Sequence, residues 1–463
     1  MHEVEGRGSG ALAELGHQVE GQVLLPGSAG YEAARRPAIA RFHGVRPRAV
    51  VRCASVADLA ATLRAARAAG LPVAVRSGGH CFAGQSSSEG GVVIDVTPLN
   101  AVTVDGGQVT AGAGTRLGEL YDALDRHGVT LPAGCGPTVG IAGLTLGGGL
   151  GILGRTYGLT CDSLRAAEVV LADGRVVGCD ERREPDLFWA LRGGGTLGVV
   201  TSLVFDTVPA PDATGFHLTW PHRRATGVIE AWQGWAPDAP DALAASLVVS
   251  TAADPDRPPV ISVFGAYMGG EAAGAALLAE LADRVGEGPA TAAYHPGPYR
   301  DVKRYLSTLD VHGLGGEPAG EDEGLMFQKS EYFARTLPPD AVAALVEHLV
   351  ADRVPGQERE LDFSPWGGAY TRVPGDATAF PHRSERFLLK HATVVAGPAG
   401  VEAGRRWLER SWALTHPHGT GGVYPNFPDP DLADPDLACY GANRHRLDQV
   451  RAAYDPDRVF GGQ

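Results

Sequence analysis

One glycine-rich stretch restricts what this chain folds into more than any other segment. Residues 131–163 read LPAGCGPTVGIAGLTLGGGLGILGRTYGLTCDS, with glycines spaced through small and aliphatic residues. Glycine inside a helix or strand costs about 0.5–1 kcal/mol relative to alanine, so this density needs a compensating role. A backbone without Cβ atoms accepts positive φ angles and lies close against a phosphate or a ring. A simple turn between strands is the alternative, but apolar residues continue through the glycines, which favours the wall of a buried cofactor.

Length and charge limit the number of domains and the kinds of partner. The chain has 463 residues, and single hydrophobic cores stop growing near ~250–300 residues, so we expect two domains. An apolar content of 44% and a charged content of 20% are ordinary for a globular protein. The net charge of −14 argues against nucleic acid and against an anionic membrane surface as partners, because both are bound through Lys and Arg.

Targeting and cysteine patterns indicate a cytoplasmic protein with free thiols. The N-terminus has no basic segment followed by an apolar core, and no later run reaches the ~18 apolar residues of a membrane helix. The six cysteines show neither CxxC nor metal-ligand spacing. We therefore expect no metal site and no disulfide framework.

The first 210 residues predict an α+β unit. Residues 1–22 are polar and glycine-rich, which predicts a loosely held extension. Hydrophobic periodicity predicts a strand at 49–53 and helices at 56–69 and 116–127, with a short helix at 186–191. Asp173-Gly174 predicts a hairpin turn. The GxGxxG context of a Rossmann site is missing from the sequence.

Composition changes near the Pro-Ala-Pro at 209–211, which indicates a domain boundary. Between 211 and 420, predicted helices alternate with predicted strands, a pattern typical of a sheet covered on one side by helices. The helices are expected at 272–285 and 339–351, and the strands at 243–250, 260–267, 361–364 and 386–395. From about 421 to 463 the composition changes again.

Five segments, in order, identify a family resemblance. They are RSGGHCFAGQSS at 76–87, the stretch 131–163, DLFWALRGGGTLGVVT at 186–201, GGAYTRVPGDATAFPHR at 367–383, and YPNF at 424–427 followed by YGANRHRLDQVRAAYDPDRVF. Over about Tyr31 to Phe460, the chain resembles the berberine-bridge-enzyme-like FAD-linked oxidases of the vanillyl-alcohol-oxidase superfamily. The resemblance implies an α+β fold: a two-part PCMH-type FAD domain (23–210 and 421–463), with a substrate domain inserted at 211–420 and built on an antiparallel sheet covered by helices.

The resemblance also implies where FAD binds. It places the pyrophosphate in the turn at 76–80, where Gly78 and Gly79 let backbone N–H groups converge on a diphosphate. In the family, a histidine at the position of His80 is bonded to the flavin 8α-methyl carbon, so the resemblance implies the same bond for His80. A second bond to flavin C6 would come from Cys135, which stands one residue earlier than in the common family pattern. The implied cofactor contacts are Arg76, Ser77, Ser86, Thr138, Gly140, Gly143, Gly147, Gly148, Gly149, Gly151, Tyr157, Gly198, Val200, Tyr424 and Asn426.

The family's catalytic pair does not transfer to this chain. In many family sugar oxidases the base is the last residue of Tyr-x-Asn-Tyr, assisted by an acid three positions before Gly-Gly; here these positions hold Phe427 and Ser364. The remaining candidates are Tyr424, Asp362 on the same strand face as Ser364, and Tyr370 on a strand after Gly367-Gly368. A tyrosine base needs a stabilised phenolate, because its ordinary pKa is near ~10. Each catalytic assignment has an alternative. Tyr424 could pack over the flavin without acting as a base, and Asp362 could be a solvated acid at a strand edge.

These residues predict a flavin enzyme. Our leading hypothesis is an FAD-dependent oxidase that removes a hydride from an alcohol or an activated C–H of a small natural-product or sugar-derived substrate, with O2 as acceptor and H2O2 as product. An oxidative cyclase or dehydrogenase of secondary metabolism is the first alternative. A flavin-binding protein without turnover is the second.

Overall fold

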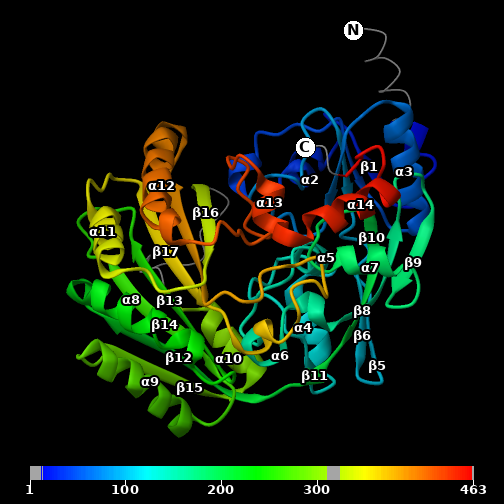
Figure 1. The fold of residues 1–463 in the computed structure, drawn as a ribbon. Helices are drawn as coiled ribbons and strands as arrows, with labels where there is room; N and C mark the ends of the chain where they lie inside the picture. Colours follow the sequence, from blue (N-terminus) through cyan, green and yellow to red (C-terminus); the bar gives the residue numbers. More distant parts are fainter. Residues whose placement is uncertain (1–11, 13, 310–323, 461–463) are drawn as a thin grey trace.

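The computed structural model describes residue 12 and residues 14–309 and 324–460, arranged as two units side by side (Figure 1). The N-terminal unit contains the chain up to about residue 210 and also the C-terminal helices. The middle unit contains the residues between. The exact boundaries at 210 and 420 stay predictions. The first eleven residues and residue 13 of the expected extension lie outside the described residues.

Two sheets build the N-terminal unit. The smaller has strand order β1-β2-β4-β3, and the larger, antiparallel, has order β5-β6-β10-β8-β9. Their strands are β1 (Gln22–Leu24), β2 (Ala49–Arg52), β3 (Val73–Arg76), β4 (Val92–Asp95), β5 (Val102–Asp105), β6 (Gln108–Gly112), β8 (Leu164–Val170), β9 (Val176–Asp180) and β10 (Val199–Asp206), with a small pair of β7 (Val129–Thr130) and β11 (Val208–Pro209). The predicted hairpin at Asp173-Gly174 is confirmed as the turn between β8 and β9.

Three helices of the N-terminal unit, at Val56–Ala68, Leu117–Asp125 and Pro185–Leu191, begin within one residue of their predicted starts. The longest, α3 (Val56–Ala68), is capped by Ser55, whose side chain accepts from the Asp58 N–H. The others are α2 (Tyr31–Arg35), α4 (Leu117–Asp125), α5 (Ile141–Leu146), α6 (Gly154–Tyr157), α7 (Pro185–Leu191), α13 (Pro435–Tyr440) and α14 (Arg444–Tyr454).

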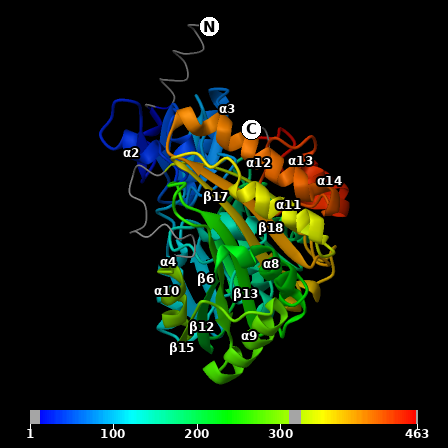
Figure 2. The ribbon, with the colours of Figure 1, turned by 90° about the vertical axis from the view of Figure 1, so that its left-hand side faces the viewer.

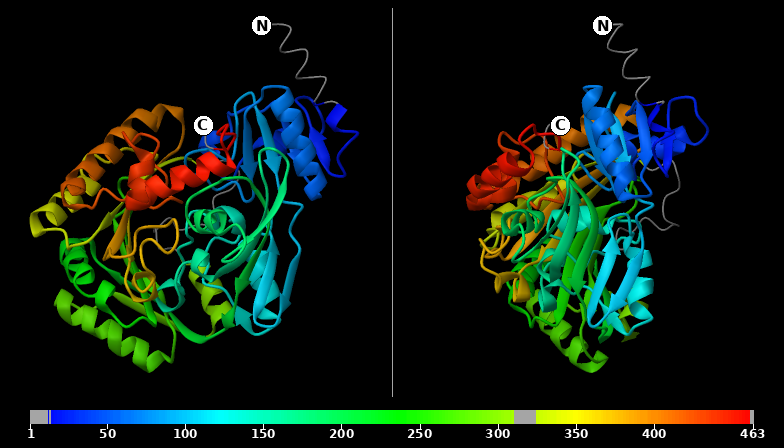
Figure 3. Two further views of the ribbon diagram at one scale, coloured as in Figure 1. Left: turned by 45° about the vertical axis from the view of Figure 1, so that its right-hand side comes forward. Right: turned by 90° about the vertical axis from the view of Figure 1, so that its right-hand side faces the viewer.

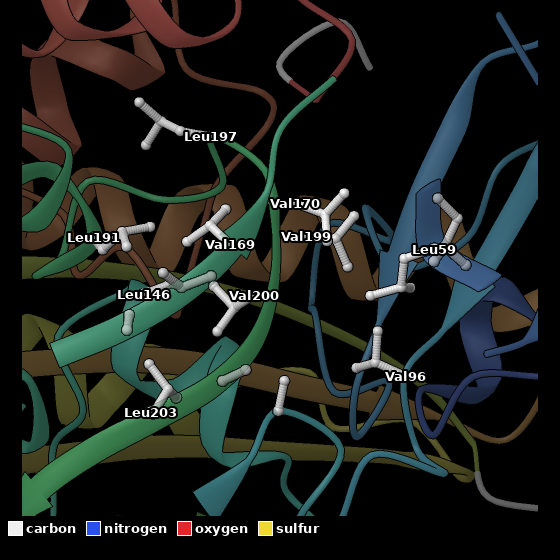
Figure 4. Packing of buried hydrophobic residues seen from close by; sticks show 14 of the residues in the cluster. Leu59, Val96, Leu146, Val169, Val170, Leu191, Leu197, Val199, Val200 and Leu203 are labelled. Carbon is white, nitrogen blue, oxygen red and sulfur yellow. The ribbon is translucent and has the colours of Figure 1, made fainter. Parts of the chain in front are cut away.

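A single large hydrophobic cluster holds this unit together, and Figure 4 shows part of it, including Leu59, Val169 and Val200. Leu447 and Val450 of α14 are buried in the same cluster, and α14 packs against α7. Figure 3 shows the C-terminal helices beside the N-terminal part of the chain. The C-terminal segment therefore returns to the unit in which the chain begins.

The start of the chain differs from the expectation of a loose extension. Leu12 and Leu15 are buried in the large cluster. The N–H groups of Glu20 and Gly21 donate to the Asp58 carboxylate at 2.9 and 3.0 Å. The described part of the extension is thus anchored, because its apolar residues pack into the large cluster, a contact that the local pattern does not reveal.

The middle unit is a seven-stranded antiparallel sheet with order β15-β12-β14-β13-β17-β18-β16. Its strands are β12 (Asp212–Trp220), β13 (Leu243–Thr251), β14 (Val260–Tyr267), β15 (Thr291–Pro298), β16 (Leu325–Phe333), β17 (Gln357–Pro365) and β18 (Phe387–Val395). Its longer helices are α8 (Ala225–Gln233), α9 (Glu271–Val285), α10 (Tyr299–Ser307), α11 (Pro339–Val350) and α12 (Val401–Thr415).

Alternation along the strands gives this sheet two different faces. Leu361 and Phe363 of β17 join the cluster formed with α8 and α11, and Figure 2 shows α11 and α12 over that side. Asp362 and Ser364 point the opposite way, toward the N-terminal unit, because strand side chains alternate. The expected antiparallel sheet covered by helices is confirmed, but the cover is not confined to one side: α8, α9, α11 and α12 pack on one face, and α10 packs on the other face against β12 and β15.

Two further findings concern the position of Tyr370 and the length of the helices. Tyr370 does not lie on a strand as expected; it lies in a short 3-10 turn, Gly368–Thr371, that follows two glycines with positive φ. Among the described helices, none combines the length and apolar character needed to cross a membrane.

Candidate cofactor and active site

The turn at residues 76–80 packs backbone against backbone. A Cβ on Gly78 would overlap the Thr138 carbonyl and the Gly140 nitrogen, and Gly79 has a φ of +75°. A Cβ on Gly140 would in turn overlap Ser77. This contact brings the two glycine-containing motifs of the sequence together as one surface with few side chains on it.

Arg76 and Ser77 shape this turn through contacts with the protein itself. Ser77 Oγ donates to the Ala113 carbonyl at 2.6 Å. The Arg76 guanidinium is buried, and its donors are taken by the carbonyls of Ala34, Arg35 and Ser86 and by Ser87 Oγ. Arg76 therefore orders the loop, and the backbone N–H groups of the turn are the donors left for a diphosphate.

Unmatched hydroxyl groups lie in the same region. Ser86 Oγ and Thr115 Oγ1 are both buried without a hydrogen-bond partner. Buried polar atoms are usually satisfied in folded proteins, so orphaned ones indicate a missing ligand. Beside the backbone N–H groups of the turn, these orphaned hydroxyls fit a large polar cofactor such as FAD.

His80 stands at the end of the turn with one ring nitrogen held. Its Nε2 lies 3.0 Å from Thr138 Oγ1. Burial, followed by the positive charge of Arg116, lowers the pKa of His80. The imidazole is therefore neutral at pH 7, the form in which a ring nitrogen is a nucleophile toward a flavin carbon.

The wall at residues 147–154 is fitted to side chains from distant segments. Gly148 and Gly149 have φ of +107° and +93°. A Cβ at Gly147, Gly151 or Gly154 would overlap a group from elsewhere in the chain. Those groups are, respectively, the Asn426 amide, the Ala133 carbonyl and Tyr370 Oη.

Tyr424 ties this wall to the C-terminal segment. Its Oη accepts from the N–H groups of Gly149 and Leu150 at 3.1 and 2.8 Å, and from Asn426 Nδ2 at 3.1 Å. Asn426 Nδ2 also donates to the Leu144 carbonyl at 2.9 Å. Burial raises the pKa of Tyr424 to about 12, although these three donors act in the opposite direction. The geometry gives Tyr424 a positioning role, and its role as a base stays a prediction.

Tyr370 and Arg155 connect the wall to the middle unit. Tyr370 Oη donates to the Gly151 carbonyl at 3.1 Å, and burial raises its pKa. The Arg155 guanidinium is buried and donates to the carbonyls of Pro237, Ala239, Leu243 and Trp366. Arg155 was missed from the sequence, because a single arginine in a glycine-rich run gives no sign of its partners.

The other predicted cofactor residues occupy varied places. Gly143 is exposed on α5, with no atom within 4 Å of a Cβ built there. Tyr157 is 37% exposed. A Cβ on Gly198 would overlap Val169, and Val200 is buried in the core of the N-terminal unit. Contact of these residues with FAD stays a prediction.

Cys135 lines a cavity between α4 and α10. The cavity, of about 340 Å³, also contains Tyr121, Tyr299 and Lys303. Lys303 Nζ donates to the Gly134 carbonyl at 2.8 Å and lies 3.0 Å from the Tyr121 ring centre. Cys135 is exposed in this cavity, so its thiol is accessible, and its bond to flavin stays a prediction. All six cysteines are free, as the sequence predicts.

Asp362 belongs to a charged cluster on the sheet face that looks toward the N-terminal unit. Lys390 Nζ lies 3.0 Å from Asp362 Oδ2 and 2.9 Å from Glu360 Oε1. Burial alone would lower the pKa of Lys390, but the two carboxylates raise it. Lys390 Nζ also lies 5.5 Å from the centre of the Phe427 ring. A charged cluster thus stands beside the position where the family's usual base is missing.

Lys390 and Glu360 were missed from the sequence. Asp362 pairs in register with Lys390 across β17 and β18, but this register is set by the whole sheet. The only local sign is that Glu360 and Asp362 alternate with apolar residues. That pattern predicts an acidic strand face and does not name its partner.

Two family models match this chain. One, described as FAD binding domain, matches residues 47–180, and another, described as Berberine and berberine like, matches residues 423–463. The FAD-linked oxidoreductase YgaK of Bacillus subtilis is 32% identical over 89% of this chain and 90% of its own length.

Solved structures agree with these matches. BBE-like 1 of Physcomitrella patens has a TM-score of 0.87 and 25% identity, over 97% of each chain. Glucooligosaccharide oxidase from Acremonium strictum, described with 6-S-cysteinyl, 8α-N1-histidyl FAD, has a TM-score of 0.85 at 24% identity, over 98% of each chain. The second likeness is one of fold.

Proposed function

Because this chain belongs to the berberine-bridge-enzyme-like family of FAD-linked oxidoreductases, we propose that it is an oxidase. It removes a hydride from an alcohol or an activated C–H of a small natural-product or sugar-derived substrate. Its acceptor is O2, and its second product is H2O2. The cytoplasmic location indicated by the sequence stays a prediction.

The observation that carries the catalytic part is the ion pair of Asp362 with Lys390 beside Phe427. Bound FAD supplies a hydride acceptor at N5. Oxidation of an alcohol also needs a group that takes the hydroxyl proton. The hydroxyls of Tyr424 and Tyr370 are buried and engaged with backbone groups. The Asp362 side chain is partly exposed on the sheet face toward the N-terminal unit, and Lys390 orients it.

The cofactor is held by a cradle formed by the turn at 76–80 and the glycine wall at 147–154. Backbone N–H groups at 78–80 receive the diphosphate, and His80 forms the bond to the flavin. Gly147, Gly149 and Gly151 let Asn426, Thr160 and Ala133 pack against the wall, and these contacts hold its backbone in place for the ring system. These roles are supported by the close backbone contacts and the orphaned hydroxyls described above.

Anaerobic mixing with a panel of alcohols, amines and sugars tests the function. We expect at least one substrate to bleach the yellow flavin, and air to restore the colour rapidly with release of H2O2. A reduced flavin that persists in air would identify a dehydrogenase or cyclase. No bleaching with any substrate would indicate a flavin-binding protein without turnover.

Replacement of the proposed proton acceptor gives a second test. We expect Asp362→Asn to slow anaerobic bleaching by about 10²–10³-fold, because a positioned base contributes on this scale. Ser364→Ala, on the same face of β17, is the matched control, and we expect its rate within about 3-fold of wild type. Equal rates for Asp362→Asn and the wild type would remove Asp362 from the mechanism.

The covalent link is tested by denaturation. Acid-precipitated wild-type protein should stay yellow, and the double variant His80→Ala/Cys135→Ala should release its flavin on precipitation. Comparison with Cys135→Ala decides the second bond, since a 6-S-cysteinyl flavin changes its absorption spectrum when the thiol is removed. A colourless wild-type precipitate would contradict the role of His80.

A further inference from the structure

A row of unmatched polar atoms follows β16 on the face toward the N-terminal unit. Gln328, Ser330 and Tyr332 alternate along this strand and so share that face. Gln328 Oε1, Ser330 Oγ and Tyr332 Oη are each buried without a hydrogen-bond partner. Ser330 is 1% exposed. Orphaned atoms at three successive positions of one strand face indicate a ligand surface.

This row adjoins the charged cluster. Ser330 stands opposite Lys390 in the register of β16 and β18, and Lys390 stands opposite Asp362 in that of β18 and β17. Residues opposite each other in an antiparallel pair share a face, with Cβ atoms about 5 Å apart. The unmatched Ser330 hydroxyl therefore lies next to the ammonium that holds Asp362 and Glu360.

The charge of this surface is negative. Alternation places Glu358, Glu360 and Asp362 of β17 on the same face. Among the described residues of β16, β17 and β18, Lys390 is the cation on that face. A carboxylate ligand would be repelled here, whereas an ammonium group gains charge attraction and brings three hydrogen-bond donors.

An apolar wall lies beside these charges. Phe427 is within 5.5 Å of Lys390 Nζ, and its ring packs edge-on against Phe82 at 5.7 Å. Phe82 follows His80 by two residues, so the wall stands next to the proposed flavin attachment. Charge and aromatic rings thus meet close to the turn that carries His80.

We propose that this face, with Ser330, Glu360, Asp362 and Lys390, recognises a protonated amine attached to an apolar body. The proposal rests on the proposed function, because it names the substrate class of the same site. Glu360 and Asp362 supply the charge attraction, Ser330 accepts a hydrogen bond, and Phe427 contacts the apolar body. The site discriminates against carboxylates by repulsion.

Three probes with one aromatic body test the charge preference. Benzylamine, benzyl alcohol and benzoate are titrated into the oxidised, flavin-loaded enzyme, with calorimetry and flavin absorption as readouts. We expect benzylamine to bind about 10-fold more tightly than benzyl alcohol, and benzoate to bind more weakly than both.

Isosteric variants locate the preference. Glu360→Gln should reduce the ratio of benzylamine to benzyl alcohol affinity by about 3- to 10-fold, and Ser330→Ala should weaken benzylamine alone. Glu347→Gln is the matched control, because this exposed glutamate lies on α11, over the other face of the sheet. Its ratio should equal that of the wild type.

The outcomes separate this proposal from the proposed function. Similar affinities for all three probes, no measurable binding of benzylamine, or an unchanged ratio in both Glu360→Gln and Ser330→Ala would overturn the amine site. Binding needs no turnover, so an enzyme that prefers benzylamine but never bleaches would retain the amine site and lose the oxidase function. Flavin bleaching by a substrate without tighter binding of benzylamine would retain the oxidase function and remove the amine site.

Discussion

The glycine wall at 147–154 and the inward face of β16–β18 meet in one buried aromatic cluster but are built in opposite ways. In the wall, the absence of Cβ atoms lets Asn426, Ala133 and Tyr370 approach, and the Tyr424 hydroxyl is surrounded by donors. On the sheet face, side chains dominate, and several of their polar atoms are unmatched. The glycine wall is thus defined by backbone shape, whereas the sheet face is defined by side-chain chemistry.

This difference predicts different responses to substitution. Backbone shape tolerates no added atom where two segments touch, so errors in the wall cost folding free energy. Unmatched side chains on the sheet face already cost free energy in the ligand-free protein, so their removal changes binding more than stability. Three experiments test the comparison.

The largest expected effect is that of Gly151→Ala. The added Cβ would overlap the Ala133 carbonyl, which is backbone and has little freedom to move. We expect a loss of about 3 kcal/mol in the free energy of unfolding, measured by urea denaturation. Gly143→Ala is the control, because its Cβ meets no atom within 4 Å; the loss there should be below about 0.5 kcal/mol. Equal losses would contradict a wall defined by contacts.

A smaller loss is expected for Lys390→Met. This change leaves Glu360 and Asp362 together without their shared cation. Removing one partner of a fully buried ion pair costs about 3–5 kcal/mol, and these side chains are partly exposed, so we expect about 2 kcal/mol at pH 7. Urea denaturation at pH 7 measures it, and a stability equal to that of the wild type would show that the ion pairs contribute nothing to folding.

The third experiment concerns the opposite face of β18. His391 is fully buried, its Nδ1 lies 2.9 Å from Ser411 Oγ, and burial lowers its pKa to about 3. Its ordinary pKa is 6.5, so the unfolded chain takes up a proton first as the pH falls. Stability from this group is present above about pH 6.5 and is lost toward pH 3. Between pH 7 and pH 5 the loss should be about 2 kcal/mol.

His391→Gln should flatten this part of the stability profile while lowering stability at pH 7. The measurement is the free energy of unfolding against pH for both proteins. If the free energy of unfolding fell with pH equally in both proteins, His391 would not be the source of the loss of stability in acid. A change in benzylamine binding in this variant would show that the two faces of β18 are not independent.

Much of the fold and the cofactor cradle could be predicted from the sequence. The glycines at 78, 79 and 140 have their reason within a few residues, since a tight turn excludes Cβ atoms. Strand alternation likewise placed Asp362 and Ser364 on one face. In contrast, the burial of Leu12 and Leu15 depends on a cluster of residues far away in the sequence, and Tyr370 lies in a 3-10 turn because Gly367 and Gly368 divert the chain.

By itself, the sequence determined the family, the glycine cradle, His80 at its end, and the loss of the usual base at Phe427. Only the tertiary structure decided that Lys390 joins Glu360 and Asp362, that Ser330 stands beside them unmatched, and that Cys135 opens into a cavity under α10. The physical reason is the distance along the sequence over which each feature is determined. Backbone conformation is encoded within a few neighbouring residues, whereas the register of three strands is set by the packing of the whole sheet.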